Sequence, residues 1–150
     1  MKTIVVLVDF SSLSFKLMKQ AHALAKAFGS HVILLHVVPL VPTTVDFGLV
    51  SPTVMEEPPA EAVRSDLEKL TEMRDSLAKF GVNATTSQFQ GGAADDVLDE
   101  IKRMDADLII VGSHGHGAFY ELVVGSVTKN VLKHPPCPVL VVPEGYGEAA

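Results

Sequence analysis

Short runs of apolar residues recur along the chain and constrain its fold more than any other feature. They lie at Ile4–Val8, Val32–Val38, Leu108–Val111 and Val139–Val142. Runs of this length, without regular polar alternation, are typical of strands covered on both faces, as in a parallel sheet. Segments with apolar residues at helical spacing separate the runs, so the pattern predicts strands that alternate with helices.

The stretch Asn83–Gln90 is more polar and predicts a strand at a sheet edge. With it, the full order becomes β-α-β-α-β-α-β-α-β. This order predicts one α/β domain over residues 1–150, with an open, doubly wound, mostly parallel sheet and helices on both faces. Residues 39–59 are rich in proline and apolar side chains, and we expect a long loop that packs on another surface, such as a partner subunit. Residues 144–150 are expected to form a frayed tail.

Charge and cysteine content exclude several classes of function. The chain has 12 basic and 18 acidic residues and a formal net charge of -6, whereas a nucleic-acid partner requires a basic surface. Cys137 is the single cysteine, so no internal disulfide can form, which fits a reducing compartment. The first apolar run is too short for a signal sequence or a membrane span. We therefore expect a cytoplasmic protein with no nucleic-acid partner and no membrane span.

A glycine-rich segment follows the apolar run that ends at Val111. Gly112, Gly115 and Gly125 with Ser126 form the pattern G-x2-G-x9-G-S, and a helical pattern begins after it. Glycines let a backbone approach an anion closely, and a helix N-terminus offers unpaired N–H groups. The glycines could instead make only a tight turn. The order of strand, glycine loop and helix favours a phosphate site, although the spacing fits neither a Walker loop nor the dinucleotide motif G-x-G-x-x-G.

Asp9 stands at the end of the first apolar run. In doubly wound sheets, ligands bind beyond the carboxyl ends of the strands where the strand order reverses, which places Asp9 opposite Gly112–Gly117. Asp9 could contact a ligand there, or it could cap the helix that follows. His36, inside the second run, is expected to be a core or sheet-end residue rather than a ligand.

The chain resembles the universal stress protein family from Met1 to about Pro143. The pieces that carry the resemblance are Val8–Ser11, Val32–Val37, Gly112–Gly115, Gly125–Thr128 and Pro136–Val142. The resemblance implies a five-stranded sheet with strand order 3-2-1-4-5. It also implies a homodimer in which the strand Val139–Val142 of each subunit meets its counterpart.

Members of that family with an intact glycine pattern bind ATP, so the resemblance implies ATP or another adenine nucleotide, accompanied by Mg2+ or Mn2+. It places Asp9 at the ribose or adenosine portion, and Val8 and Val37 beside the adenine. The residues that it assigns to the sugar and the phosphates are Gly112, Ser113, His114, Gly115, Gly125, Ser126, Val127 and Thr128.

Two sharper interpretations of the histidines are weaker than the nucleotide site. His114, His116 and His134 could form a metal site, but no carboxylate or thiolate accompanies them, and three histidines make a thin ligand set. The order His-Gly-His-Gly after His114 does not match the H-x-G-H motif of nucleotidyltransferases, because the glycine is misplaced. Cys137 lies between prolines at a strand start, which is typical of a structural residue. We expect no catalytic residue and no metal held by protein side chains.

Three functions stay open at this point. The first is an ATP-binding sensor or regulator of a stress response, as the resemblance implies. The second is a slow ATPase or phosphotransfer enzyme on the same scaffold, although the glycine segment offers no Lys or Arg for transition-state charge. The third is an interaction protein whose loop no longer binds a nucleotide.

Overall fold

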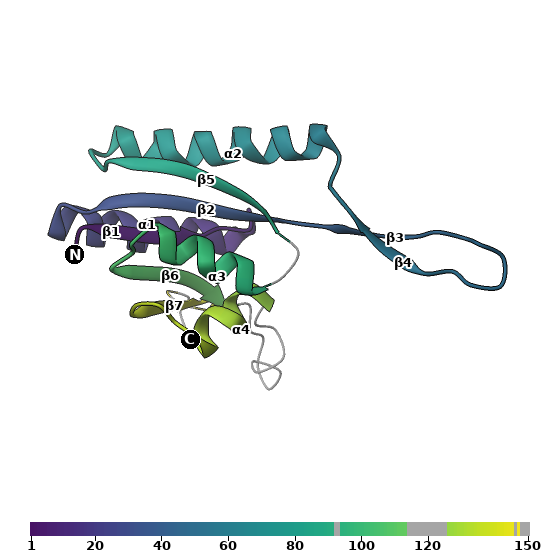
Figure 1. Ribbon diagram of the computed structural model, residues 1–150. Helices are drawn as coiled ribbons and strands as arrows, with labels where there is room; N and C mark the ends of the chain where they lie inside the picture. Colours follow the sequence, from purple (N-terminus) through teal and green to yellow (C-terminus); the bar gives the residue numbers. More distant parts are fainter. Residues whose placement is uncertain (92–93, 114–125, 146, 148–150) are drawn as a thin grey trace.

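A computed structural model gives the fold and describes residues 1–91, 94–113, 126–145 and 147. Within these residues, a five-stranded parallel sheet forms the centre of the molecule (Figure 1). Its strands are β1 (Thr3–Leu7), β2 (His31–Pro39), β5 (Ala84–Gly91), β6 (Leu108–Ser113) and β7 (Val139–Pro143). The spatial order is β5-β2-β1-β6-β7. This order is 3-2-1-4-5 when the strands of the sheet are numbered along the chain, so the expected fold is confirmed.

Four described helices cover the two faces of the sheet. They are α1 (Ser12–Phe28), α2 (Ala60–Lys79), α3 (Ala94–Arg103) and α4 (Ser126–Lys133). Helices α1 and α2 pack on one face, and α3 and α4 pack on the other (Figure 1). Gly29 ends α1 in a left-handed conformation, which glycine adopts without steric cost. None of the described helices is long and apolar enough to cross a membrane.

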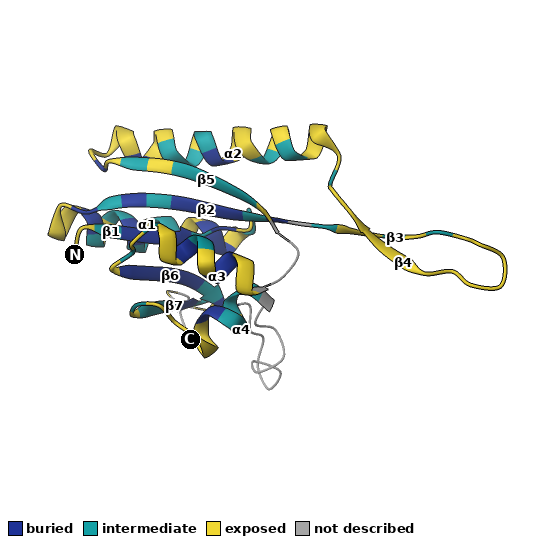
Figure 2. Cartoon of the chain, in the orientation of Figure 1, coloured by how far each residue is buried: buried dark blue, intermediate teal, exposed yellow. Residues whose placement is uncertain are grey.

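The burial pattern of β1 explains why its sequence is apolar without alternation. Successive side chains of a strand point to opposite faces of a sheet. Ile4 and Val6 pack against α1 and α2, while Val5 packs against α3 and α4. All three side chains are fully buried, as the dark blue colour of this strand shows (Figure 2). Because helices cover both faces, both sets of side chains must be apolar.

The segment expected to be a long loop contains two further strands. β3 (Val41–Thr44) and β4 (Thr53–Glu56) pair antiparallel into a two-stranded ribbon, which we call the arm. The sequence pattern did not predict these strands, because proline at residues 42 and 52 argues against regular strands. The arm extends away from the body of the molecule (Figure 1). Packing on a partner subunit stays a prediction.

Candidate functional site

A cleft of ≈ 220 Å³ lies at the carboxyl ends of β1, β2 and β6. The chain continues from β1 to β2 on one side and returns to β6 on the other, so the strand order reverses between β1 and β6. Ligands of doubly wound sheets bind at such a reversal. The residues that line the cleft are Leu7, Val8, Asp9, Leu13, Leu17, Leu35, His36, Val37, Gly112, Val127 and Thr128.

The structure brings six of the predicted site residues together in this cleft. These residues are Val8, Asp9, Val37, Gly112, Val127 and Thr128. They come from three strand ends and from the first turn of α4. The sequence argument that Asp9 lies opposite the end of β6 is thus supported by the shared cleft.

The structure describes only some of the other predicted site residues. Ser113 is the buried last residue of β6, and its carbonyl accepts a 3.0 Å hydrogen bond from the N–H of Glu144. That bond ties down the first residue of the predicted tail. Ser126 begins α4, but its side chain is not described. His114, Gly115 and Gly125, to which the sequence assigns phosphate contacts, lie outside the described residues.

Asp9 organises the start of α1 as well as lining the cleft. Its Oδ1 accepts hydrogen bonds from the Ser11 N–H at 3.0 Å and the Ser11 hydroxyl at 2.6 Å. A third bond comes from the Ser14 hydroxyl at 3.3 Å. Ser11 is the N-cap residue by position but makes no side-chain cap bond, so Asp9 supplies the carboxylate that the helix start favours. The two roles that the sequence left open for Asp9 are therefore compatible.

Gly112 is required for a reason that the motif did not reveal. A Cβ atom at this position would lie 2.4 Å from Cδ2 and 2.9 Å from Cγ of Leu13. Leu13 is only 2% exposed and belongs to the core between α1 and the sheet. Gly112 is not among the described residues with a positive φ. The glycine therefore lets α1 approach the end of β6, and this close packing forms one wall of the cleft.

His36 lines the cleft and was not predicted as a site residue. It is 8% exposed, and its Nδ1–H donates to the carbonyl of Val8 at 2.8 Å. Its Nε2 lies 3.3 Å from Oδ2 of Asp66 on α2, and its ring lies 4.3 Å from that of Phe10. The expectation of a sheet-end residue is supported, since His36 fixes the ends of β1 and β2 relative to α2. The strand pairing of Leu7 with Leu35 places His36 beside the cleft, next to Val37, which the family resemblance had identified.

The electrostatic character of the cleft comes from the backbone and from one carboxylate. Its described lining contains no Lys or Arg. Val127 and Thr128 lie in the first turn of α4, where no acidic residue stands. A helix N-terminus carries free N–H groups and a partial positive charge, which favour an anion. Among the described residues, no group of three or more His, Cys, Asp or Glu could hold a metal ion.

Two groups with shifted pKa values lie at the opposite, amino end of the sheet. The pKa of Asp107 is lowered because its carboxylate accepts hydrogen bonds from the N–H groups of Thr3 and Lys2, at 2.9 Å and 2.6 Å. The pKa of the Cys137 thiol is raised by burial and, to a smaller extent, by the charge of Asp107. Both residues stand at strand starts, so these shifts reflect the attachment of strands rather than a catalytic centre.

The family model described as "Universal stress protein family" matches residues 1–143. The chain belongs to the universal stress protein family. Universal stress protein MJ0531 of Methanocaldococcus jannaschii is 30% identical over 146 residues, which cover 94% of this chain and 81% of that protein. Universal stress protein YxiE of Bacillus subtilis is 32% identical over 141 residues, which cover 91% and 95%.

Solved universal stress protein structures share the fold. The Archaeoglobus fulgidus protein in complex with dAMP has a TM-score of 0.66 at 23% identity, with 94% of this chain and 97% of that chain covered. A family member in complex with cAMP has a TM-score of 0.67 at 21% identity, with 95% and 96% covered. The Arabidopsis thaliana protein with AMP bound has a TM-score of 0.63 at 18% identity, with 100% and 97% covered. At these identities the likeness shows the fold.

Proposed function

We propose that this universal stress protein binds ATP, or another adenine nucleotide, in the cleft at the ends of β1 and β6 and acts as a nucleotide-dependent regulator of a stress response in the cytoplasm. The observation that carries the proposal is that six residues predicted from distant parts of the sequence line one cleft. Structural neighbours have been solved in complex with dAMP, cAMP and AMP, and these complexes support an adenine nucleotide as the ligand.

The chemistry of the cleft suits the parts of a nucleotide. Val8 and Val37 offer an apolar wall for a purine base. The carboxylate of Asp9 can accept hydrogen bonds from ribose hydroxyls. The start of α4, with Val127 and Thr128, also lines the cleft and favours the negative phosphates. The divalent cation that accompanies ATP would be held chiefly through its phosphates, as Mg2+ usually is.

A substitution on α4 tests the location of the site. Thr128→Glu places a negative charge beside the proposed phosphate position, and we expect the affinity for ATP to fall about tenfold or more. Lys129→Glu is the matched control, because Lys129 is an exposed neighbour on the same helix that does not line the cleft. Calorimetry with ATP, ADP, AMP and cAMP, with and without Mg2+, measures both variants. An equal loss in both variants would show that general charge, not the cleft, governs binding.

The same titration separates the remaining functions. A regulator binds nucleotide in a saturable manner with phosphate release at background level. Phosphate release that rises with protein concentration and is lost in Thr128→Glu would instead establish an ATPase. Protein that binds none of the four nucleotides would overturn the proposal in favour of an interaction protein.

We further propose a homodimer through β7. In the described residues this strand lies at the edge of the sheet and pairs with β6, so its outer edge can accept a second β7. Light scattering gives the mass. Amide hydrogen exchange gives the location, because pairing protects the outward-facing N–H groups of Val139–Val142 that a monomer leaves exposed. Outward amides that exchange at the same rate at all protein concentrations would contradict a dimer at this edge.

A further inference from the structure

The arm presents an apolar face that is largely exposed in the part of the chain that the structure describes. In an antiparallel ribbon, directly paired residues share a face and alternate residues change face. The pairs Val41–Glu56 and Thr43–Val54 fix the register, and the hydrogen bonds from Val45 N–H to Pro52 and from Phe47 N–H to Val50 continue it. The apolar residues on the resulting face are Val41, Val45, Phe47, Val50 and Val54.

Most of this face is exposed, as the mainly yellow colour of the arm shows (Figure 2), and Val45 is half-buried. Phe47 is 72% exposed and Val50 is 65% exposed, and Leu49 at the tip is fully exposed. An isolated two-stranded ribbon is marginally stable in water without a surface to pack on. The arm extends away from the body (Figure 1), so another molecule could supply the surface on which it packs.

A groove between α1 and α2 offers such a surface. This α1–α2 groove has a volume of ≈ 690 Å³ and contains none of the predicted nucleotide residues. Phe15 and Phe80 form part of its walls and are 69% and 66% exposed. The ring of His22 packs edge-on against Phe80 at 5.7 Å and joins α1 to the end of α2. Two exposed phenylalanines in one groove mark an interaction surface.

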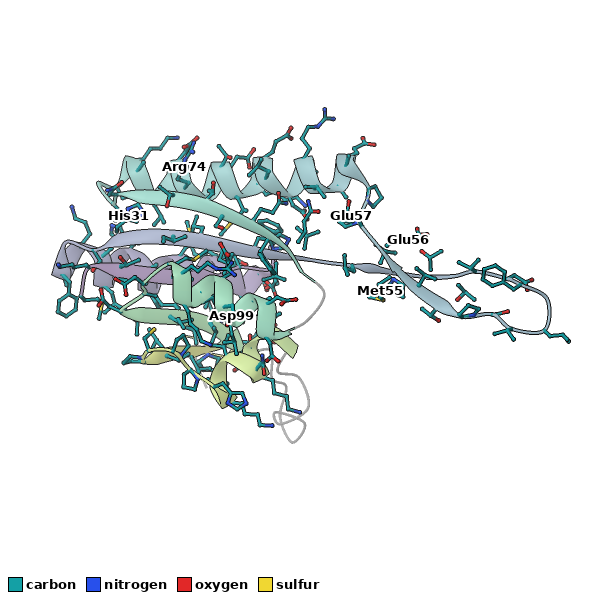
Figure 3. The ribbon with its side chains drawn as sticks, viewed as in Figure 1. His31, Met55, Glu56, Glu57, Arg74 and Asp99 are labelled. Atoms are coloured by element: carbon teal, nitrogen blue, oxygen red, sulfur yellow. The ribbon has the colours of Figure 1, made fainter. Side chains whose placement is uncertain are left out.

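Charge complementarity favours the arm of a second copy as the occupant of the groove. Residues 39–59 contain Asp46, Glu56 and Glu57 and no Lys or Arg. Figure 3 shows Glu56 and Glu57 at the base of the arm. The described lining of the α1–α2 groove includes Lys19, Lys69 and the carboxylate of Glu72, and Lys69 Nζ lies 3.6 Å from Oδ1 of Asp66. Two arms packed face to face would bring like charges together, whereas an arm in the groove brings carboxylates to lysines.

We propose that the arm of one copy of this chain docks in the α1–α2 groove of a second copy. The arm and the groove belong to the same chain, so two copies related by a twofold axis can exchange arms and form two identical contacts. From Val41 to Phe47 the extended chain of the arm spans about 20 Å at ~3.3 Å per residue, long enough to lie along a helix pair. Helix α2 packs on β5 and β2, at the opposite side of the sheet from β7. The exchange therefore leaves the β7 edge free.

Photo-cross-linking tests the contact directly. Phe47 is replaced by the photoreactive analogue p-benzoylphenylalanine in the full chain, which keeps an aromatic side chain at an exposed position. Mass spectrometry of a mixture of isotope-labelled and unlabelled protein then maps each adduct and shows whether it joins two chains. We expect inter-chain adducts on α1–α2 groove residues. Adducts on the arm of the second copy, adducts within one chain, or no protein adduct would each overturn the proposal.

Matched variants give an independent measurement. Phe47→Ser on the arm and Phe15→Ser in the groove should each weaken the concentration-dependent association by about tenfold or more in sedimentation equilibrium, as for a central aromatic contact. Phe28→Ser is the control, since Phe28 is a 57% exposed aromatic residue of α1 outside the groove lining. Mixing the arm and groove variants should restore part of the association, because one of the two contacts is then intact. Association of the two variants equal to that of Phe28→Ser would contradict the contact.

Discussion

Gly112→Ala provides a quantitative test of the packing that forms the cleft. The added Cβ would lie 2.4 Å from Cδ2 of Leu13, about 1 Å short of the ordinary contact distance of 3.4–4 Å. Leu13 is 2% exposed, so its side chain cannot move out into solvent. Overpacking of this kind costs about 1–3 kcal/mol. We therefore expect the free energy of unfolding to fall by that amount, measured by urea denaturation.

The matched control is Gly145→Ala, because a Cβ atom at Gly145 meets nothing within 4 Å and the residue does not have a positive φ. Its stability should stay within about 0.5 kcal/mol of the wild type. In a Leu13→Ala background, the side-chain atoms that oppose the new methyl group are gone. The loss of unfolding free energy caused by Gly112→Ala should therefore be smaller there than in the wild type, by at least about 1 kcal/mol. If Gly112→Ala reduces nucleotide affinity while its urea midpoint stays at the wild-type value, the packing explanation is wrong and Gly112 serves the ligand alone.

Three further predictions concern single side chains. Asp107→Asn should destabilise the protein at neutral pH, because folding lowers the pKa of the Asp107 carboxyl below 3.8. In an acid-unfolding series, the difference in stability between wild type and variant should persist above that pH and disappear as the pH falls through the lowered pKa. Cys137, whose pKa is raised above 9.0 mainly by burial, should react with iodoacetamide more slowly than a free thiol at pH 8, and fast alkylation would refute its burial. Asp9→Ala should lower stability by about 1 kcal/mol in thermal unfolding, because the bonds from Ser11 and Ser14 at the start of α1 are lost, and an unchanged midpoint would exclude the capping role.

The sheet could be predicted from the sequence because its strands are covered on both faces. The run Ile4–Val8 is apolar throughout because helices cover both faces of the sheet, and this continuous apolar pattern can be recognised in the sequence. The sequence pattern of the arm is weaker. Pro42 and Pro52 interrupt its apolar pattern, and the ribbon depends on a few local hydrogen bonds, such as that from Gly48 N–H to Asp46. Propensity alone cannot distinguish such a ribbon from a loop.

The site was predicted where its residues follow strand ends and missed where packing decides. Asp9 follows from the rule for ligand positions in doubly wound sheets, and Val37 follows from the family resemblance. His36 was assigned to the sheet end but not to the cleft, because a histidine in an apolar run carries no signal of what its ring contacts. The steric role of Gly112 depends on Leu13, a residue about 100 positions away, and no local pattern contains that contact.

The central place of β1 also governs how the chain can fold while it is being made. β1 is synthesised first, yet its neighbour β6 begins only at Leu108, which pairs with Ile4. At roughly 5–20 residues per second, one side of this apolar strand waits roughly 5–20 seconds for its partner on the ribosome. During that interval the nascent polypeptide exposes a strand edge that could pair with other nascent chains. The middle of the finished sheet is thus the first strand translated and among the last to be enclosed.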